Sequence, residues 1–343
     1  MTLLLSACQN PVVETEQEQG RVSVDSGSMK RDEASSDELR IIGSYHEDMV
    51  KSLAEMYGEK YGCQVSYVRM PTGDAEAKLI AEMENPTCDV WIGGTVDAHE
   101  ILKEKGILVS CQTQGEKEIP PQYLDADGVW KTQYVEVLSI GINSERWENE
   151  FAVEGIEKPT TLEDLLNPVY KGEIIIPDPV TSGTGYTFIA SVLSAMGEEE
   201  GWKYLEKLNA QVGQYTSNGY TAAEKTGLGE YLVCVNFLSD QLLVKSYGYP
   251  LDNCVYEGAG WTAVPVSLTS GGKNNPEARR FIEFCLTKEA CDVLVSLGNV
   301  LAVRDDCIGE TKLENLSLNR NFNAVNETEA KTDRIQRFVE MMP

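Results

Sequence analysis

Short strand-like and helix-like segments alternate from residue 39 onward, and this alternation constrains the fold more than any other feature. Apolar runs near 39–45, 63–70 and 88–94 are bounded by turn residues, as strands are. A segment with helical spacing of apolar residues follows each run; the first contains Met49, Val50, Leu53, Met56 and Tyr57. Three β-α units in succession predict an α/β fold, with a mostly parallel sheet covered by helices.

The middle and end of the chain continue the pattern. We expect strands at 137–144, 173–179 and 231–240. We expect helices at 159–172, 181–197, 198–209 and 275–298. A length of 343 residues exceeds that of a usual single domain, so two domains with a cleft between them are predicted.

The N-terminus resembles the end of a lipoprotein signal peptide. Leu5-Ser6-Ala7-Cys8 has the apolar, small, small, cysteine order of a lipobox, and 1–8 is interpreted as a truncated signal. A chance Leu-Ser-Ala-Cys run is the alternative. Residues 9–38 are acidic and polar, so they predict a disordered tether. The hypothesis is a lipid on Cys8 that moors a globular protein outside a membrane.

Charge and cysteine content exclude some classes of function. The formal net charge is -26, which argues against nucleic acid as a partner, although a buried site for a small anion depends on local groups. The cysteines include no CxxC pair, so a zinc ribbon or redox motif is not expected. Cys63 and Cys88 either form a disulfide bridge or remain two buried thiols, and the sequence leaves both possibilities open.

Polar residues and glycines follow the expected strands at their carboxyl ends. Ligands of open α/β sheets bind at these ends. The candidate ligand-binding residues are Ser44, Tyr45, His46, Thr72, Gly73, Asp74, Gly94, Thr95, Ser182, Gly183, Thr184, Ser217, Tyr220, Ser239, Asp240 and Glu257.

The TSGT run at 181–184 is a candidate anion seat. The first turn of a helix has unpaired N–H groups with partial positive charge, and glycine lets a ligand approach the backbone. An ordinary Ser or Thr cap with a packing glycine explains the run equally simply. The PTGD run at 71–74 has the same two interpretations.

The other candidates have two interpretations as well. Asp240 and Glu257 are suited to accepting hydrogen bonds from a polyol, or they form structural ion pairs. His46 is suited to donating a hydrogen bond to an anion or to binding a metal. Alternatively, it is a solvated residue at a helix start. The GxSxG, HExxH, P-loop and GxGxxG signatures of enzymes are absent from the sequence, so no enzyme is predicted.

Four stretches together resemble the extracellular solute-binding proteins of ABC importers, in the branch of ferric-ion and sugar-phosphate binders. They are residues 44–62, 77–108, 160–187 and 275–290. The resemblance implies a two-domain venus-flytrap fold of the type II periplasmic-binding-protein kind. It also implies one domain at 39–135 plus 262–343 and another at 136–261, with the ligand between them.

Within that branch, the residues favour a phosphate over iron. Ferric binders use a histidine after the first strand, a carboxylate after the third and a tyrosine pair in the second domain. His46 matches the histidine, whereas Gly94 stands at the carboxylate position and Ser239-Asp240 at the tyrosine pair. Sugar-phosphate binders bind the phosphate at the turn that matches 182–184, and a His-Asp pair contacts the sugar hydroxyls. Here Asp240 keeps the carboxylate and Ser239 replaces the histidine.

The resulting hypothesis is a monomeric, lipid-anchored solute receptor outside the cytoplasm. It would deliver a small anionic solute, a sugar phosphate or other organophosphate, to an ABC permease. It would need no cofactor or resident metal. A ferric-ion or metal-complex binder, a ligand-sensing partner of a membrane kinase and an extracellular enzyme are the alternatives.

Overall fold

The computed structural model describes residues 38–309, 315–319 and 321–342. The expected lipobox at Cys8 and the tether expected over 9–38 lie outside these residues, except for Glu38, which begins the first strand. Of the helices within the described part, none combines the length and apolar character that crossing a bilayer requires.

The three β-α units expected at the start of the sheet are present. Their strands are β1 (Glu38–Ser44), β2 (Gln64–Arg69) and β3 (Val90–Gly93). Their helices are α1 (Glu47–Tyr61), α2 (Thr72–Ala81) and α3 (Val96–Glu104). β1 pairs in parallel with both β2 and β3, as the alternation predicts.

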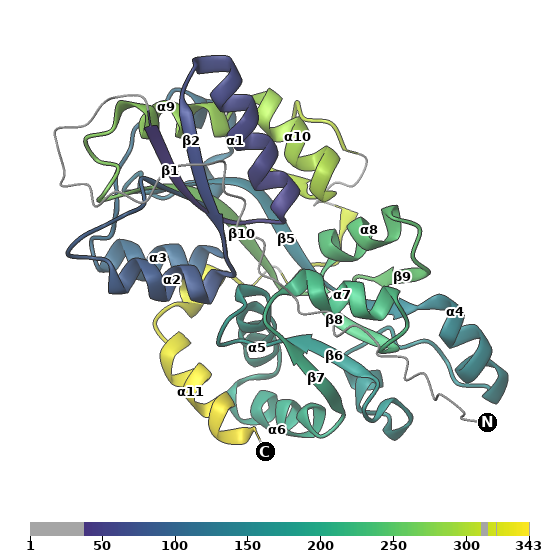
Figure 1. Ribbon diagram of the computed structural model, residues 1–343. Coiled ribbons are helices and arrows are strands. Elements are labelled where there is room, and N and C mark those ends of the chain that lie inside the picture. The colour runs from purple at the N-terminus through teal and green to yellow at the C-terminus, as the bar shows by residue number, and fades with distance from the viewer. Residues whose placement is uncertain (1–37, 310–314, 320, 343) are drawn as a thin grey trace, which may run out of the picture. The chain divides into compact units, whose positions relative to one another are not determined.

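Helices cover both faces of this part of the sheet (Figure 1). Leu39 and Ile41 of β1 pack in one core with α1, α9 (Pro276–Cys285) and α10 (Lys288–Gly298). Ile42 faces the opposite side, where it packs with α2 and α3. Because successive side chains of a strand alternate between faces, the run of apolar residues in β1 fills two cores at once.

The long strand β5 (Trp130–Asn143) connects two sets of strands within the eleven-stranded sheet that the described residues form. All 14 of its residues are buried. Its first part pairs with β10 (Trp261–Thr269) and β11 (Leu301–Ala302), and its last part pairs with β8 (Val233–Phe237) and β9 (Leu251–Cys254). The short strand β4 (Leu108–Val109) pairs with β10.

The second set of strands carries its own helices. β6 (Ile174–Pro177) lies parallel to β7 (Val212–Thr216) and to β8. The helices here are α4 (Ser144–Arg146), α5 (Gly183–Met196), α6 (Glu198–Asn209), α7 (Gly219–Gly227) and α8 (Leu238–Ser246). The α/β class predicted from the sequence is therefore confirmed, but the sheet is mixed rather than mostly parallel, because β10 and β5 pair antiparallel with their neighbours.

Three expected elements differ from those in the structure. The helix expected at 159–172 is a pair of 3₁₀ turns, because Pro168 lacks an N–H group and Asn167 before it is extended, with φ -61° and ψ 124°. The strand expected at 231–240 ends at Phe237, and its last three residues begin α8. The helix expected at 275–298 is two helices, and the Thr287 side chain caps the second by accepting from Ala290 N.

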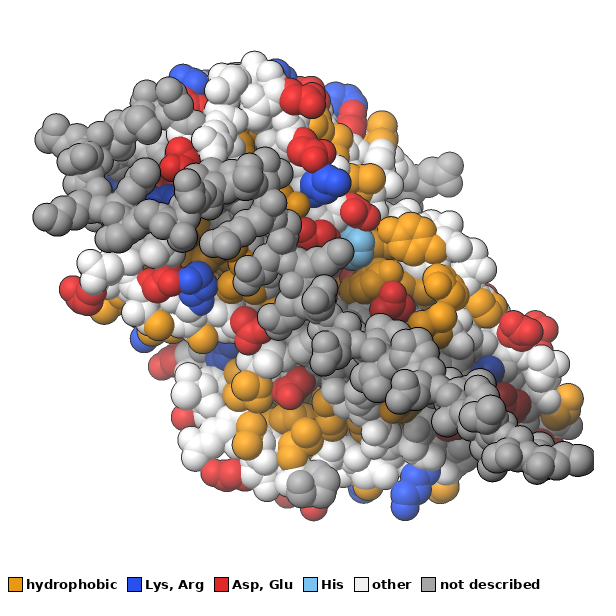
Figure 2. Space-filling model, in the orientation of Figure 1, with side chains coloured by type: hydrophobic (Ala, Val, Ile, Leu, Met, Phe, Trp, Pro, Cys, Tyr) orange, Lys and Arg blue, Asp and Glu red, His pale blue; other side chains and the backbone are white. Residues whose placement is uncertain are grey.

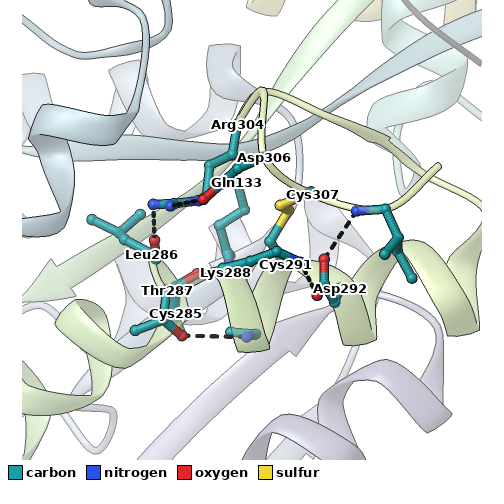
Figure 3. Close-up of a disulfide and its surroundings, with 12 residues drawn as sticks. Gln133, Cys285, Leu286, Thr287, Lys288, Cys291, Asp292, Arg304, Asp306 and Cys307 are labelled. Atoms are coloured by element: carbon teal, nitrogen blue, oxygen red, sulfur yellow. Dashed lines mark hydrogen bonds and ion pairs between the residues drawn. A yellow bond between two sulfur atoms is a disulfide. The ribbon is translucent and has the colours of Figure 1, made fainter.

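A disulfide joins Cys291 of α10 to Cys307 (Figure 3). Cys88 is a buried thiol, so a Cys63–Cys88 bridge is not formed. The Arg304 guanidinium lies beside the disulfide, donating to Leu286 O at 3.0 Å and pairing with Asp306 at 2.8 Å. The disulfide and Arg304 together attach the segment that contains β11 to the α9–α10 pair.

The last helix, α11 (Lys331–Met341; Figure 1), makes ion pairs with other helices through its first turn. Lys331 Nζ lies 2.7 Å from a Glu76 oxygen of α2 and 2.8 Å from an Asp97 oxygen of α3. Arg334 pairs with Glu198 of α6 at 2.7 Å. The C-terminal helix therefore links helices of the first β-α units to a helix of the second set.

We predict that Lys331→Met destabilises the protein by about 3–5 kcal/mol, because it leaves the buried Asp97 carboxylate without its cation. Lys60→Met is the matched control, since Lys60 pairs with Glu289 at the surface and its loss should change stability much less. Urea unfolding measures both. Equal losses in the two variants would contradict the prediction.

Candidate ligand-binding site

One cavity collects most of the candidate residues. It encloses about 80 Å³, and the empty space rises to about 680 Å³ when its open mouth is included. The candidates that line it are Ser44, Tyr45, His46, Thr72, Gly94, Thr95, Ser182, Thr184, Tyr220, Ser239 and Asp240. They come from the ends of strands on both parts of the sheet, where the sequence pattern places them.

Five candidates do not line this cavity. Gly73 and Gly183 line an adjoining cavity behind the two turns. Asp74 and Ser217 are exposed, and the Ser217 carbonyl accepts from the Thr181 hydroxyl at 3.1 Å. Glu257 is exposed at a separate cavity lined by Ser191, Tyr256 and Asn319, so the structure does not bring it to Asp240.

Six of the described helices begin at this cavity. The residues that immediately precede α1, α2, α3, α5, α7 and α8 all line it: His46, Pro71, Thr95, Ser182, Asn218 and Phe237. Among them only Asn218 caps its helix with its side chain, by accepting from Thr221 N. The free N–H groups of first helical turns carry partial positive charge, so their convergence creates a site suited to an anion.

The TSGT and PTGD turns contact each other directly. Gly73 N donates to Thr181 O at 2.8 Å. A Cβ atom on Gly183 would lie 2.5 Å from Thr95 Oγ1 and 3.0 Å from Thr72 Oγ1, so only glycine fits there without a shift.

Ser182 makes no side-chain cap, and the buried Thr95 hydroxyl has no hydrogen-bond partner in the protein. The ordinary capping interpretation therefore does not account for the Ser182 hydroxyl. A buried polar atom that lacks a partner in the protein is expected to find one in a ligand or solvent.

Arg69 is the one lysine or arginine among the described residues that line the cavity. It ends β2, and its Nε donates to Tyr45 O at 3.0 Å. Burial lowers the pKa of its guanidinium, and Asp240 is the first of the nearby carboxylates that offset this effect. Acidic side chains are spread over the face of the molecule shown in Figure 2, so this cation lies within a mostly negative protein.

Two carboxyl groups, Glu136 and Asp240, line the cavity, and Ser239 is bound to the first of them. Ser239 Oγ lies 2.7 Å and 2.6 Å from the two oxygens of Glu136, which β5 contributes. Burial, together with the charge of Asp240, raises the pKa of Glu136 well above its usual range. Burial also raises the pKa of Asp240 to about 7, against the opposing effects of Asn236 and Arg69. The raised pKa values favour the protonated forms of both carboxyl groups, and a pKa of about 7 leaves Asp240 close to half ionised at neutral pH.

The two histidines have different environments. His46 packs against Tyr220, with ring centroids 4.7 Å apart, and its Nδ1 lacks a hydrogen-bond partner. Burial lowers the pKa of His46, so its imidazole is mostly neutral at pH 7. His99 lies away from the cavity lining, stacked on Trp91 and hydrogen-bonded to Ser267 and Gly93, as a packing residue.

Several cavity residues were not among the candidates from the sequence, notably Arg69, Tyr134, Glu136, Asn218 and Gly219. Arg69 lies two residues before the PTGD turn and Asn218 directly precedes a helix, so local pattern could have indicated both. Glu136 lies in a buried strand just before the expected strand at 137–144. Its approach to Ser239 joins residues 103 positions apart, which no local pattern reports.

Within the described residues no group of three His, Cys, Asp or Glu side chains is arranged to hold a metal ion. His46, Glu136 and Asp240 all line the cavity but do not form such a group.

Comparisons with known proteins identify the class. Residues 85–332 match the family model described as bacterial extracellular solute-binding protein, and the chain belongs to this family. An uncharacterized protein of Haemophilus influenzae is 31% identical over 306 residues, 85% of this chain and 87% of that protein. Membership implies a small solute as ligand and a location outside the cytoplasm.

Solved structures confirm the type II periplasmic-binding-protein fold. The periplasmic binding protein AfuA of Actinobacillus pleuropneumoniae, solved with exogenous fructose-6-phosphate bound, is 30% identical with a TM-score of 0.83. That match covers 89% of this chain and 98% of AfuA. Iron-bound HitA of Pseudomonas aeruginosa shares the fold at 18% identity and a TM-score of 0.77, over 88% of this chain and 99% of HitA.

We predict that Asp240→Asn stabilises the protein by about 2 kcal/mol at pH 8 and has little effect near pH 4. The folded-state pKa of about 7 lies above the usual 3.8, so the folded protein retains a proton that the unfolded chain releases. This contribution to stability is present at low pH and is lost as pH rises through 7.

Urea unfolding at the two pH values tests this prediction. Asp252→Asn is the control, because Lys158 lowers the pKa of Asp252 and the substitution should slightly destabilise the protein at pH 8. An Asp240→Asn effect that does not change with pH would contradict the prediction.

Proposed function

We propose that this protein is the solute-binding component of an ABC importer and that it captures a small phosphorylated solute, a sugar phosphate or another organophosphate. The convergence of six helix N-termini, five of them without a side-chain cap, is the observation that carries this proposal.

The phosphate would lie where the TSGT and PTGD turns meet. Main-chain N–H groups of α5 and α2 would donate to its oxygens, and so would the hydroxyls of Thr72, Thr95, Ser182 and Thr184. Thr95 is the clearest of these donors, because its buried hydroxyl has no other partner. Arg69 would add a formal positive charge from the end of β2.

The body of the solute would contact the carboxyl side of the cavity. Asp240 and Glu136 offer oxygen atoms to the hydroxyl groups of a polyol, and the Tyr220 ring offers an apolar wall beside His46. The similarity to AfuA supports a sugar phosphate as the solute class. Gly73 and Gly183 would act by letting the two turns approach each other.

A metal complex is the second candidate within this class, and the fold shared with HitA is its basis. The donor set of the cavity supports it less well, since only His46 corresponds to a ferric ligand. Delivery to a permease, a lipid anchor at Cys8 and a monomeric state are parts of the proposal that follow from the sequence. A probable ABC transporter periplasmic-binding protein of Sinorhizobium fredii supports the first, at 26% identity over 65% of this chain and 62% of that protein.

We predict that phosphorylated sugars raise the melting temperature of the full-length protein and that plain sugars do not. A ligand at about 100 times its Kd adds about 2.7 kcal/mol of stability. A thermal-shift panel would contain fructose 6-phosphate, glucose 6-phosphate, inorganic phosphate, fructose and ferric citrate. A shift with ferric citrate alone would replace the phosphate proposal with the metal-complex candidate.

We predict that Thr95→Val lowers the affinity for fructose 6-phosphate about tenfold or more, because it removes a hydroxyl donor to a charged group. Thr132→Val is the matched control, since the Thr132 hydroxyl is also buried without a partner but is not part of the cavity lining. Titration calorimetry measures both affinities. Equal affinities in the two variants would exclude Thr95 as a ligand contact.

A further inference from the structure

We propose that Asp240 takes up a proton from solvent when the anionic solute binds, so that this receptor binds its ligand more tightly as pH falls toward neutrality. The inference rests on the proposed function, because it requires an anion in the cavity. It adds to that function a coupling between solute capture and pH.

The first argument is the position of the Asp240 carboxyl group. A Cβ atom on Gly219, the first residue of α7, would lie 2.4 Å from Asp240 Oδ2 and 2.9 Å from Thr184 Oγ1. Asp240 Oδ2 and the Thr184 hydroxyl therefore flank the same point, so the carboxyl group is next to the N-terminus of α5. An anion at that terminus would have Asp240 as its near neighbour.

The second argument is the set of charged and titratable groups around Asp240. Arg69 is the one formal cation, and burial lowers its pKa. The remaining groups that face Asp240 or line the cavity with it are Tyr134 and Glu136 of β5, Tyr220 of α7, Cys234 of β8, Tyr45 and His46. None of the groups in that set adds a second positive charge at pH 7.

Charged groups on the other elements packed against α8 are already paired. Asp252 of β9 lies 2.8 Å from Lys158 and 3.7 Å from Lys245. Asp292 of α10 pairs with Lys288. None of these three lysines is among the residues that line the cavity, so they do not neutralise Asp240.

The charge of a bound anion would itself favour protonation of Asp240. A phosphate dianion beside an ionised Asp240 would place like charges together in a poorly solvated cavity, which favours the protonated carboxyl. The pKa of Asp240 is already raised to about 7 without ligand, so little further change is needed to protonate it. Glu136 is less suited to this role, because burial and the charge of Asp240 raise its pKa well above the usual range and favour its protonated form without ligand.

The direction in which affinity changes with pH follows from the effect of the bound anion on Asp240. Binding raises the pKa of Asp240, so affinity should fall as pH increases above about 7. A phosphate monoester has its second pKa near 6, so its own charge changes little in this range. We expect the affinity for fructose 6-phosphate to fall about tenfold between pH 7 and 8.5.

Titration calorimetry of the full-length protein with fructose 6-phosphate tests the proposal. At pH 7.5, measurements in two buffers with different ionisation enthalpies give the number of protons taken up per ligand bound. We expect about half a proton or more in the unmodified protein. Because this number of protons is measured on the unmodified protein, it does not depend on the behaviour of any variant.

Two variants assign the proton. Asp240→Asn should abolish the uptake and flatten the pH profile, whereas His46→Asn should keep the uptake, because burial lowers the pKa of His46 and leaves it neutral. Uptake that persists in Asp240→Asn and disappears in His46→Asn would overturn the assignment.

The outcomes separate the two proposals. Binding of fructose 6-phosphate without proton uptake and with a flat pH profile would overturn the coupling and leave the proposed function intact. Failure of every phosphorylated compound in the panel to bind would overturn the proposed function, and the coupling with it.

Discussion

The structure depends on the burial of one long strand. All 14 residues of β5 are buried, and its first part pairs with a different set of strands from its last part. Its pairs with β10 end at Val137, and its pairs with β8 begin at Leu138. Glu136 lies at this change of partners, so the cavity forms where two parts of the sheet share a single strand. Residues from both parts can therefore reach one ligand.

A protein with a net charge of -26 can still offer a favourable place for an anion, because the site depends on local groups. Five helix termini without a side-chain cap begin at the cavity and provide partial positive charge, and the Glu136 and Asp240 carboxyl groups that line it have raised pKa values. The same burial that makes carboxylates unfavourable favours their protonated, neutral forms. The cavity is thus compatible with a ligand that has a charged end and a polar, uncharged body.

The sequence predicted the parts of this site that depend on local pattern. Strand ends and helix starts are readable from periodicity, so Ser182, Thr95 and Asp240 were found before the structure. Glu136 and the Cys291–Cys307 pair could not be found in this way, because each contact is set by how distant segments pack. Glu257 shows the opposite error: a carboxylate beside an apolar run lies at a different cavity.

The direct contact between the two turns has a consequence for how such receptors diverge. The proposed anion seat would consist largely of main-chain groups, and Gly73 N donates to Thr181 O through backbone atoms alone. Most side-chain substitutions leave these groups in place, whereas a single change at Ser239 or Asp240 would alter what the rest of the cavity can recognise. Descendants of one gene can therefore acquire new solutes that share an anionic group, without rebuilding the part of the pocket that holds it.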